Sequence, residues 1–172
     1  MQSIYRCQGK IRKYIDILVH CVCFHQLDSI ENLTSEFLDK NYGVNVRATA
    51  LLCKEFLLNY SGKGGRIVLL SSMQDKEHLI SEIAYAITKA SIPVLTKTLS
   101  PLLTSKGITI NAINPGTTDI GLTDTHNEHY LSNDPCRRLG TPTDSANVVS
   151  FLVSEAGKWI RGQTIDSDGG LG

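Results

Sequence analysis

Residues 61–72 read Ser-Gly-Lys-Gly-Gly-Arg-Ile-Val-Leu-Leu-Ser-Ser, and this stretch decides the fold. Its glycines are typical of the end of a helix, because glycine readily adopts the conformation that closes one. Arg66–Leu70 is a short, mostly apolar run, which is typical of a strand buried on both faces of a sheet. Ser71 and Ser72 then place two polar side chains where that strand ends.

Strand-like and helix-like segments alternate along the rest of the chain. Further strands are predicted at Ile17–Cys23, Ile108–Ile113 and Gln163–Ser167, and helices at Thr34–Asp39, Asn45–Tyr60, Glu82–Ser105 and Ser145–Ser154. This order predicts the α/β class, with a parallel sheet, right-handed crossovers and helices on both faces. Because no linker interrupts the pattern, residues 1–172 are predicted to form a single domain.

Composition limits the classes of function. The 172 residues are 41% apolar, and 17 lysines plus arginines balance 17 aspartates plus glutamates, so the formal net charge is zero. A neutral chain has no field that would attract nucleic acid or an anionic membrane. No apolar run is long enough to span a bilayer, and Met1–Tyr14 lacks the apolar stretch of a secretory signal. These features predict a soluble cytoplasmic protein that binds neither nucleic acid nor membrane.

The five cysteines, at positions 7, 21, 23, 53 and 136, are odd in number and irregularly spaced. This is typical of free thiols rather than of a disulfide framework. An alternative hypothesis is a zinc site, because alternation along a strand would place Cys21, Cys23 and His25 on one face. No second pair of ligands stands at a recognisable spacing, so ordinary strand residues are the favoured interpretation and no metal is predicted.

Polar groups follow the predicted strands at the end where ligands sit in parallel sheets. Ser72 follows one strand, and Tyr85 and Lys89 lie four residues apart on the next helix, so they face the same side of it. A neighbouring ammonium favours a phenolate, so Lys89 is expected to lower the pKa of Tyr85 from about 10 and make it usable for proton transfer. Ser72 can hold a substrate oxygen, and Asn45 can contact water or backbone between helices.

These residues belong to a longer series of motifs. In chain order they are Asp16-Ile-Leu-Val19, Val44-Asn45-Val46-Arg47, Gly65-Arg-Ile-Val68 with Ser71-Ser72, Tyr85-Ala-Ile-Thr-Lys89-Ala90, Ile110-Asn111-Ala112-Ile113-Asn114-Pro115-Gly116, Arg138-Leu-Gly-Thr-Pro142, Phe151-Leu-Val-Ser154 and Gly162-Gln-Thr-Ile-Asp166 with Gly169-Gly170. In this order and spacing, the chain resembles the short-chain dehydrogenase/reductase family from about Asp16 to Gly172. Within that family it is similar to bacterial reductases that resemble 3-oxoacyl carrier-protein reductases.

The resemblance implies a Rossmann-like sheet and an oxidoreductase that transfers hydride between a nicotinamide cofactor, NAD or NADP, and a small carbonyl or alcohol substrate. It implies a catalytic tetrad of Asn45, Ser72, Tyr85 and Lys89. Tyr85 would donate the proton in reduction, and Ser72 would orient the carbonyl. Lys89 would lower the pKa of Tyr85 and bind the nicotinamide ribose, and Asn45 would position a water of the proton relay.

The resemblance also implies where the cofactor binds and how the subunits assemble. Cofactor contacts are expected from Tyr85, Lys89, Pro115, Gly116, Thr117 and Thr118. A homo-oligomer is expected by the same resemblance. The polar segment Thr117–Asn133, expected to be a loop that shapes the substrate pocket, does not identify the substrate.

The N-terminal part departs from the family pattern. The family begins with a strand, a glycine-rich turn and a helix that together bind the cofactor's pyrophosphate. Only fifteen residues precede Asp16, and Gly9 is the only glycine before Gly43. The chain is therefore expected to be an N-terminally truncated member that lacks the first βαβ segment. Without that segment, the strand at Ile17–Cys23 is expected to be an exposed apolar edge. This predicts either self-association through the edge or a swapped or rearranged N-terminus made by Met1–Ile15.

Three single residues also depart from the pattern. Cys23 stands where the family has a glycine that lets the backbone approach the cofactor. Ile120 stands where it has a threonine that contacts the nicotinamide, and Pro93 is expected to kink the helix after Lys89. Two hypotheses therefore stay open. One is an active oxidoreductase, and the other is a non-catalytic relic or interaction subunit that does not bind cofactor by itself.

Overall fold

The computed structural model describes residues 14–72, 80–121, 135, 136 and 138–170. These residues form a parallel sheet in the order β1 (Ile17–His20), β2 (Gly65–Leu70), β3 (Ile108–Asn114) and β4 (Thr164–Asp166). The predicted α/β class and parallel sheet are confirmed. Residues 1–13 and most of the predicted loop Thr117–Asn133 lie outside the described residues.

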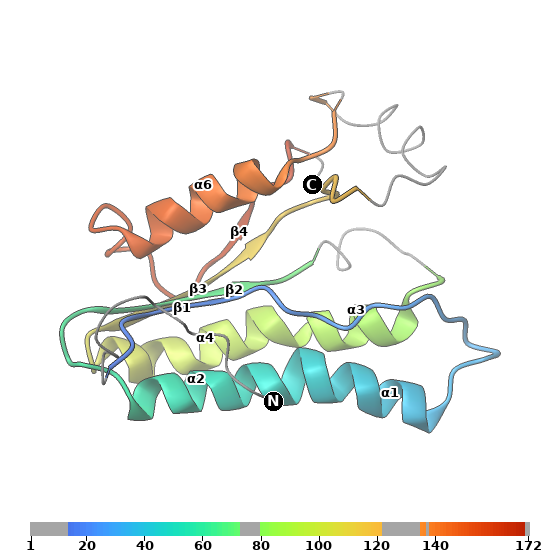
Figure 1. The fold of residues 1–172 in the computed structure, drawn as a ribbon, viewed down its shortest axis with the longest axis horizontal. Helices are drawn as coiled ribbons and strands as arrows, with labels where there is room; N and C mark the ends of the chain where they lie inside the picture. Colours follow the sequence, from blue (N-terminus) through green and yellow to red (C-terminus); the bar gives the residue numbers. More distant parts are fainter. Residues whose placement is uncertain (1–13, 73–79, 122–134, 137, 171–172) are drawn as a thin grey trace.

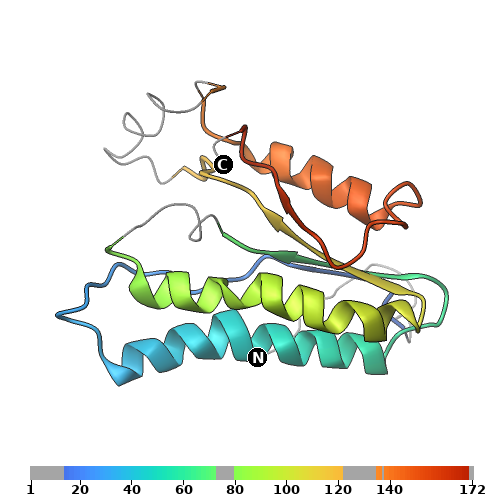
Figure 2. The ribbon, with the colours of Figure 1, turned by 180° about the vertical axis from the view of Figure 1, so that it is seen from behind.

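Helices cover both faces of this sheet (Figures 1 and 2). One face carries α1 (Ser35–Asn41), η1 (Tyr42–Ala48), α2 (Thr49–Leu58), α3 (Ile83–Lys89) and α4 (Ser91–Thr104), and the other carries α6 (Pro142–Val153). Ile67, Leu69 and Ile110 of the central strands belong to the core beneath α2 and α4, whereas Val68 and Ile113 pack with α6. Burying each such side chain contributes about 1.5 to 3 kcal/mol. Every helix within the described ranges is too short or too polar to cross a membrane.

One continuous helical rod follows the loop after β1. Thr34 caps its start, because the Oγ1 atom accepts the backbone N–H of Phe37 at 3.2 Å. The helices predicted at Thr34–Asp39 and Asn45–Tyr60 are joined by the seven-residue π-helical segment η1. Single π turns inside helices are frequent at functional sites. This one holds Asn45, a candidate site residue whose side chain is buried.

The predicted helix Glu82–Ser105 is divided at Ala90, between α3 and α4. This division lies three residues before Pro93, where the sequence predicts a kink. Pro93 therefore falls in the first turn of α4, where its missing N–H costs no helical hydrogen bond. The break follows Lys89, so α3 carries both Tyr85 and Lys89 undistorted.

α6 begins at Pro142 rather than at the predicted Ser145. Thr141 and Asp144 form a capping box in which the Thr141 Oγ1 accepts the Asp144 N–H at 3.3 Å and the Asp144 carboxylate accepts the Thr141 N–H at 2.7 Å. The predicted strand Gln163–Ser167 is shortened to β4. Gln163, the first residue of the predicted strand, is not part of β4, because its N–H donates to the Asn111 side chain at 3.1 Å.

β1 is shorter than predicted and lies at the edge of the described sheet. It ends at His20 rather than Cys23, because the chain beyond it turns to pair the backbone of Phe24 with the Asn45 amide. Ile17 and Val19 are 49% and 38% exposed. Among the described strands, β1 pairs with β2 alone. An exposed apolar edge is therefore present in the part of the chain that the structure describes.

Positive charge along β1 is expected to reduce self-association. Replacing Ile17 and Val19 together by lysine places like charges on the edge, which disfavours pairing with another strand. We expect the wild-type chain to elute as a species larger than one chain, and the double variant to shift toward the monomer, in size-exclusion chromatography with light scattering. Leu27→Lys, at a loop position that is 64% exposed, is the control. A monodisperse wild-type monomer contradicts this prediction.

Candidate active site

A cleft of about 600 Å³ opens at the carboxyl ends of β1, β2 and β3, between these strand ends and the start of α6. This is the edge at which the sequence predicts a ligand. Its walls come from segments far apart in the chain and include Val19, Cys21, Cys23, Leu70, Tyr85, Lys89, Pro115, Gly116, Thr118, Ile120 and Val149. The predicted site residues Asn45, Ser72 and Thr117 do not line the cleft.

A carboxylate from another segment fixes the start of α3. Asp28 accepts the backbone N–H groups of Ile83 at 2.6 Å and of Ala84 at 2.8 Å, and its own N–H donates to the Ser81 carbonyl at 2.8 Å. The first N–H groups of a helix lack partners within the helix and attract negative charge. The loop after β1 thereby sets the direction of the helix that carries Tyr85 and Lys89. Sequence reasoning missed Asp28, because no local pattern connects it with a helix 55 residues later.

The Asn45 side chain connects the same loop with α3. Its Oδ1 accepts the Phe24 N–H at 2.7 Å, and its Nδ2 donates to the Phe24 carbonyl at 3.0 Å and to the Thr88 Oγ1 at 2.9 Å. Thr88 lies between Tyr85 and Lys89 on α3. Asn45 is only 2% exposed. The structure therefore gives Asn45 the backbone and interhelical contacts that the sequence predicts, beneath the cleft rather than in its wall.

Burial raises the pKa of Tyr85 to about 12. Electrostatic interactions with Cys23 and Glu82 raise the pKa of Tyr85 further, whereas a hydrogen bond from Ser72 lowers it. The expected lowering by Lys89 is wrong. The Lys89 Nζ donates to the Leu70 carbonyl and lies 5.9 Å from the centroid of the Tyr85 ring. Desolvation is the largest cause of the raised pKa, and the phenol keeps its proton at neutral pH.

Lys89 is itself 5% exposed. Burial lowers the pKa of its ammonium, and the thiols of Cys23 and Cys21 oppose this by raising it. The same ammonium, together with burial as the larger cause, lowers the pKa of His20 at the end of β1. The carboxyl end of β1 is thus electrostatically coupled to α3.

His25 and Glu82 also belong to the site, and sequence reasoning missed this role. The ring of His25 meets that of Tyr85 edge to face, with centroids 4.9 Å apart and planes at 80°. The His25 Nε2 lies 3.2 Å from the Glu82 Oε1, so Glu82 anchors the imidazole. The sequence marked His25 only as a potential zinc ligand. Within the described ranges, no three His, Cys, Asp or Glu side chains are grouped to hold a metal, so the zinc hypothesis gains no support.

The segment after β3 forms another wall of the cleft. Pro115, Gly116 and Thr118 line it, and Gly116 has a φ of +65°, which a side chain would disfavour. Thr117 does not line the cleft. Its carbonyl accepts the Gly140 N–H at 2.9 Å. Ile120 lines the cleft with an apolar side chain.

Comparison with known proteins agrees with this geometry. A family described as Enoyl-(Acyl carrier protein) reductase matches residues 3–172. The chain belongs to the short-chain dehydrogenase/reductase family. It is 40% identical to the uncharacterized oxidoreductase YjdA of Bacillus subtilis over 92% of this chain, and 32% identical to the 3-oxoacyl-[acyl-carrier-protein] reductase FabG of Rickettsia felis over 91%. The chain spans 64% of YjdA and 67% of FabG.

A solved ketoreductase has the same fold. The angucycline C-6 ketoreductase LanV, with bound NADP, superposes with a TM-score of 0.86 at 29% identity, over 92% of this chain and 63% of LanV. The predicted resemblance and the Rossmann-like fold are thereby confirmed.

Removing the Asn45 amide is expected to destabilise this member of the family. Asn45→Ala leaves both backbone groups of Phe24 without their partner, and an unpaired buried group costs about 1 to 3 kcal/mol. We expect the free energy of unfolding, measured by urea titration, to fall by about 2 to 4 kcal/mol. Asn59→Ala loses one exposed hydrogen bond to the Glu55 carbonyl and should cost about 1 kcal/mol or less. Equal losses in the two variants argue against the bridging role.

Tyr85 is expected to make stability fall at alkaline pH. Its folded pKa of about 12 lies above the ordinary value of 10, so its contribution is complete below pH 10 and is lost as the pH rises toward 12. The stability of the wild type relative to Tyr85→Phe should therefore decrease by up to about 2 to 3 kcal/mol over this range. Urea unfolding at several pH values measures the difference, and exposed Tyr42→Phe is the control. A difference that does not change with pH would refute the raised pKa.

Proposed function

We propose that the cleft reduces a small carbonyl compound, or oxidises the corresponding alcohol, by hydride transfer with NAD or NADP. The observation that carries this proposal is the position of Tyr85 and Lys89 in one cleft at the carboxyl ends of three parallel strands, with Ser72 bonded to the phenol. The NADP-bound ketoreductase LanV and the reductase FabG support the reaction class by similarity.

Tyr85 supplies the proton in this proposal. With a pKa of about 12, it is protonated at neutral pH and can donate to a carbonyl oxygen that gains negative charge. The Ser72 hydroxyl bonds the phenol oxygen. When the substrate binds, this single O–H turns to the carbonyl oxygen as a second donor and so orients the carbonyl. The ring of His25 contacts the phenol ring edge to face, and Glu82 holds His25. These contacts fix the ring, so that the proton is presented in one direction.

Lys89 and Asn45 act around this donor. The positive charge of Lys89 stabilises the phenolate that remains once the proton has moved. Asn45 holds the loop after β1 against α3 through Phe24 and Thr88, and in this proposal it also positions a water that returns the proton.

The described residues fit one half of a nicotinamide cofactor. When bound, the cofactor supplies the hydride. Lys89 uses one of its three N–H donors on the Leu70 carbonyl, which leaves two for ribose hydroxyls. Pro115, Gly116 and Thr118 would hold the nicotinamide, with Ile120 as an apolar wall. A glycine-rich turn that leads into a helix, the usual pyrophosphate site, is absent from the described residues, so the proposal assigns them the nicotinamide and its ribose only.

A second candidate is an interaction subunit that keeps the fold without binding cofactor by itself. Cys23 favours it, because its side chain enters the cleft and bonds Tyr85, where a glycine would leave open space.

Titration with NADH and with NADPH by calorimetry separates the two candidates. We expect one cofactor to bind with a dissociation constant in the micromolar range, which corresponds to about 8 kcal/mol. Lys89→Met should weaken that binding at least tenfold, because the ribose loses its donors. The absence of binding for either cofactor at millimolar concentration would overturn the enzyme proposal in favour of the interaction subunit.

Turnover of a panel of small ketones and aldehydes then tests the proton donor. Tyr85→Phe should still bind cofactor but lower the turnover rate by about 100-fold or more, because general acid catalysis is lost. Tyr42→Phe, on the exposed surface of η1, is the matched control and should leave the rate unchanged. Equal rates in wild type and Tyr85→Phe would exclude Tyr85 as the donor.

A further inference from the structure

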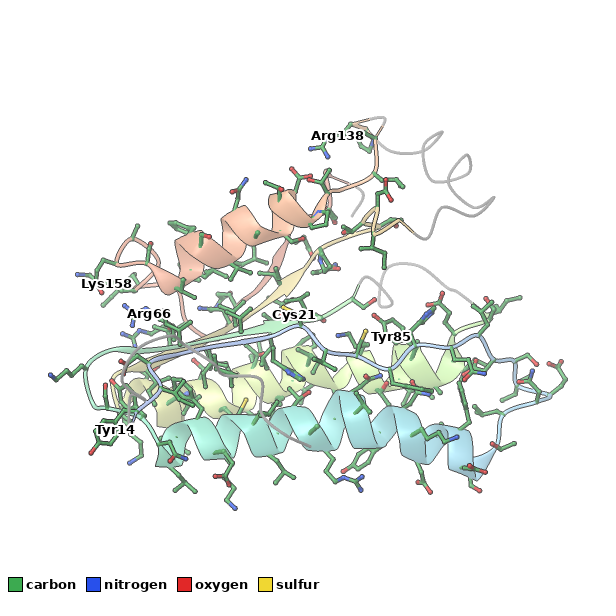
Figure 3. The ribbon with its side chains drawn as sticks, viewed as in Figure 1. Tyr14, Cys21, Arg66, Tyr85, Arg138 and Lys158 are labelled. Atoms are coloured by element: carbon green, nitrogen blue, oxygen red, sulfur yellow. The ribbon has the colours of Figure 1, made fainter. Side chains whose placement is uncertain are left out.

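Two thiols lie in the cleft beside Tyr85, the proposed proton donor, and Lys89. Cys21 and Cys23 follow β1, are free and exposed, and both line the cleft with Tyr85 and Lys89. Figure 3 shows Cys21 beyond β1 and Tyr85 on α3. The proposed hydride transfer uses neither thiol, so the cleft holds nucleophiles that its main chemistry does not require.

Cys23 shares the cleft with a phenol and an ammonium, those of Tyr85 and Lys89. The hydrogen bond between Tyr85 and Cys23 raises the pKa of the phenol, so the protonated phenol is its donor and the sulfur is its acceptor. Lys89 interacts electrostatically with both cleft thiols. A proton donor and a cation in the same cleft suit the addition of this thiol to an electrophile, because negative charge develops on the electrophile as the bond forms.

The other described cysteines lack this combination. Burial raises the pKa of Cys21, although Lys89 opposes the rise. Cys53 is buried in the core, and burial raises its pKa to about 11. Cys136 is exposed outside this cleft, and its thiol donates to the Gly169 carbonyl at 3.2 Å. Cys23 is therefore the described cysteine that combines exposure, a cleft for a ligand, a proton donor and a cation.

We propose that Cys23 is a covalent modification site for α,β-unsaturated carbonyl compounds. The sulfur bonds to the β-carbon, the π electrons of the C=C bond move to the carbonyl oxygen, and a proton then adds to the α-carbon. The thiol proton that is lost balances the proton gained, so no oxidant or reductant is required. The Tyr85 hydroxyl assists by donating to the carbonyl oxygen, and this choice of electrophile rests on the proposed carbonyl site. The adduct occupies the cleft beside Tyr85 and Lys89.

Labelling with N-ethylmaleimide, an α,β-unsaturated dicarbonyl compound, tests the site in the wild-type chain. Intact mass spectrometry and peptide mapping follow each cysteine under limiting reagent. We expect Cys23 to react about tenfold faster than Cys136, because the cleft holds the reagent beside Tyr85 and Lys89, whereas Cys136 lies outside this cleft. Cys21→Ser and Cys23→Ser assign the label within their shared peptide, and only Cys23→Ser should abolish the fast phase. A fast phase at Cys136, or one that survives Cys23→Ser, overturns the proposal.

Two further variants test the two activating groups. Lys89→Met should slow the Cys23 reaction about tenfold, with exposed Lys106→Met as its control. Tyr85→Phe should slow the reaction with N-ethylmaleimide more than that with methyl methanethiosulfonate, which has no carbonyl group, and Tyr42→Phe is the control. Unchanged Cys23 rates in both cleft variants overturn the proposal. Because labelling requires no cofactor, it can succeed where the cofactor titration fails, and it can fail while the reductase proposal stands.

Discussion

The amide of Asn45 joins three parts of the molecule that lie far apart in the sequence. It pairs both backbone groups of Phe24, 21 residues away, and the hydroxyl of Thr88, 43 residues away. This pairing ends β1, and the π turn of η1 carries the amide to it. Asp28, in the same loop, then caps α3 through two backbone N–H groups. The loop after β1 and α3 therefore form one unit, and the position of Tyr85 depends on it.

Burial controls the electrostatics of this unit. An ammonium one turn away from a phenol favours the phenolate, yet the pKa of Tyr85 rises because the ring is removed from water and the ammonium is directed to the Leu70 carbonyl. The same desolvation lowers the pKa of Lys89. Both groups are thus driven toward their neutral forms. A neutral phenol is a proton donor rather than a base, which suits the reduction of a carbonyl better than the first step of alcohol oxidation.

The cleft combines this proton donor with an accessible nucleophile. A carbonyl held by Tyr85 lies in the neighbourhood of Cys23, because the phenol already bonds that sulfur. The proposed hydride transfer and the proposed thiol addition would therefore use the same space. A ligand bound for one of these reactions would therefore block the other reaction.

Local patterns in the sequence determined the α/β class, the order of strands and helices along the chain and the shared helix face of Tyr85 and Lys89. These features depend on periodicity and on residues four positions apart, so no distant contact is needed to predict them. The tertiary structure decided the length of β1, the π turn, the break at Ala90, the cap by Asp28 and the direction of the Tyr85 pKa. Each of these depends on which distant groups share one buried space, and hydrogen bonding and desolvation there exceed the local preferences of the chain.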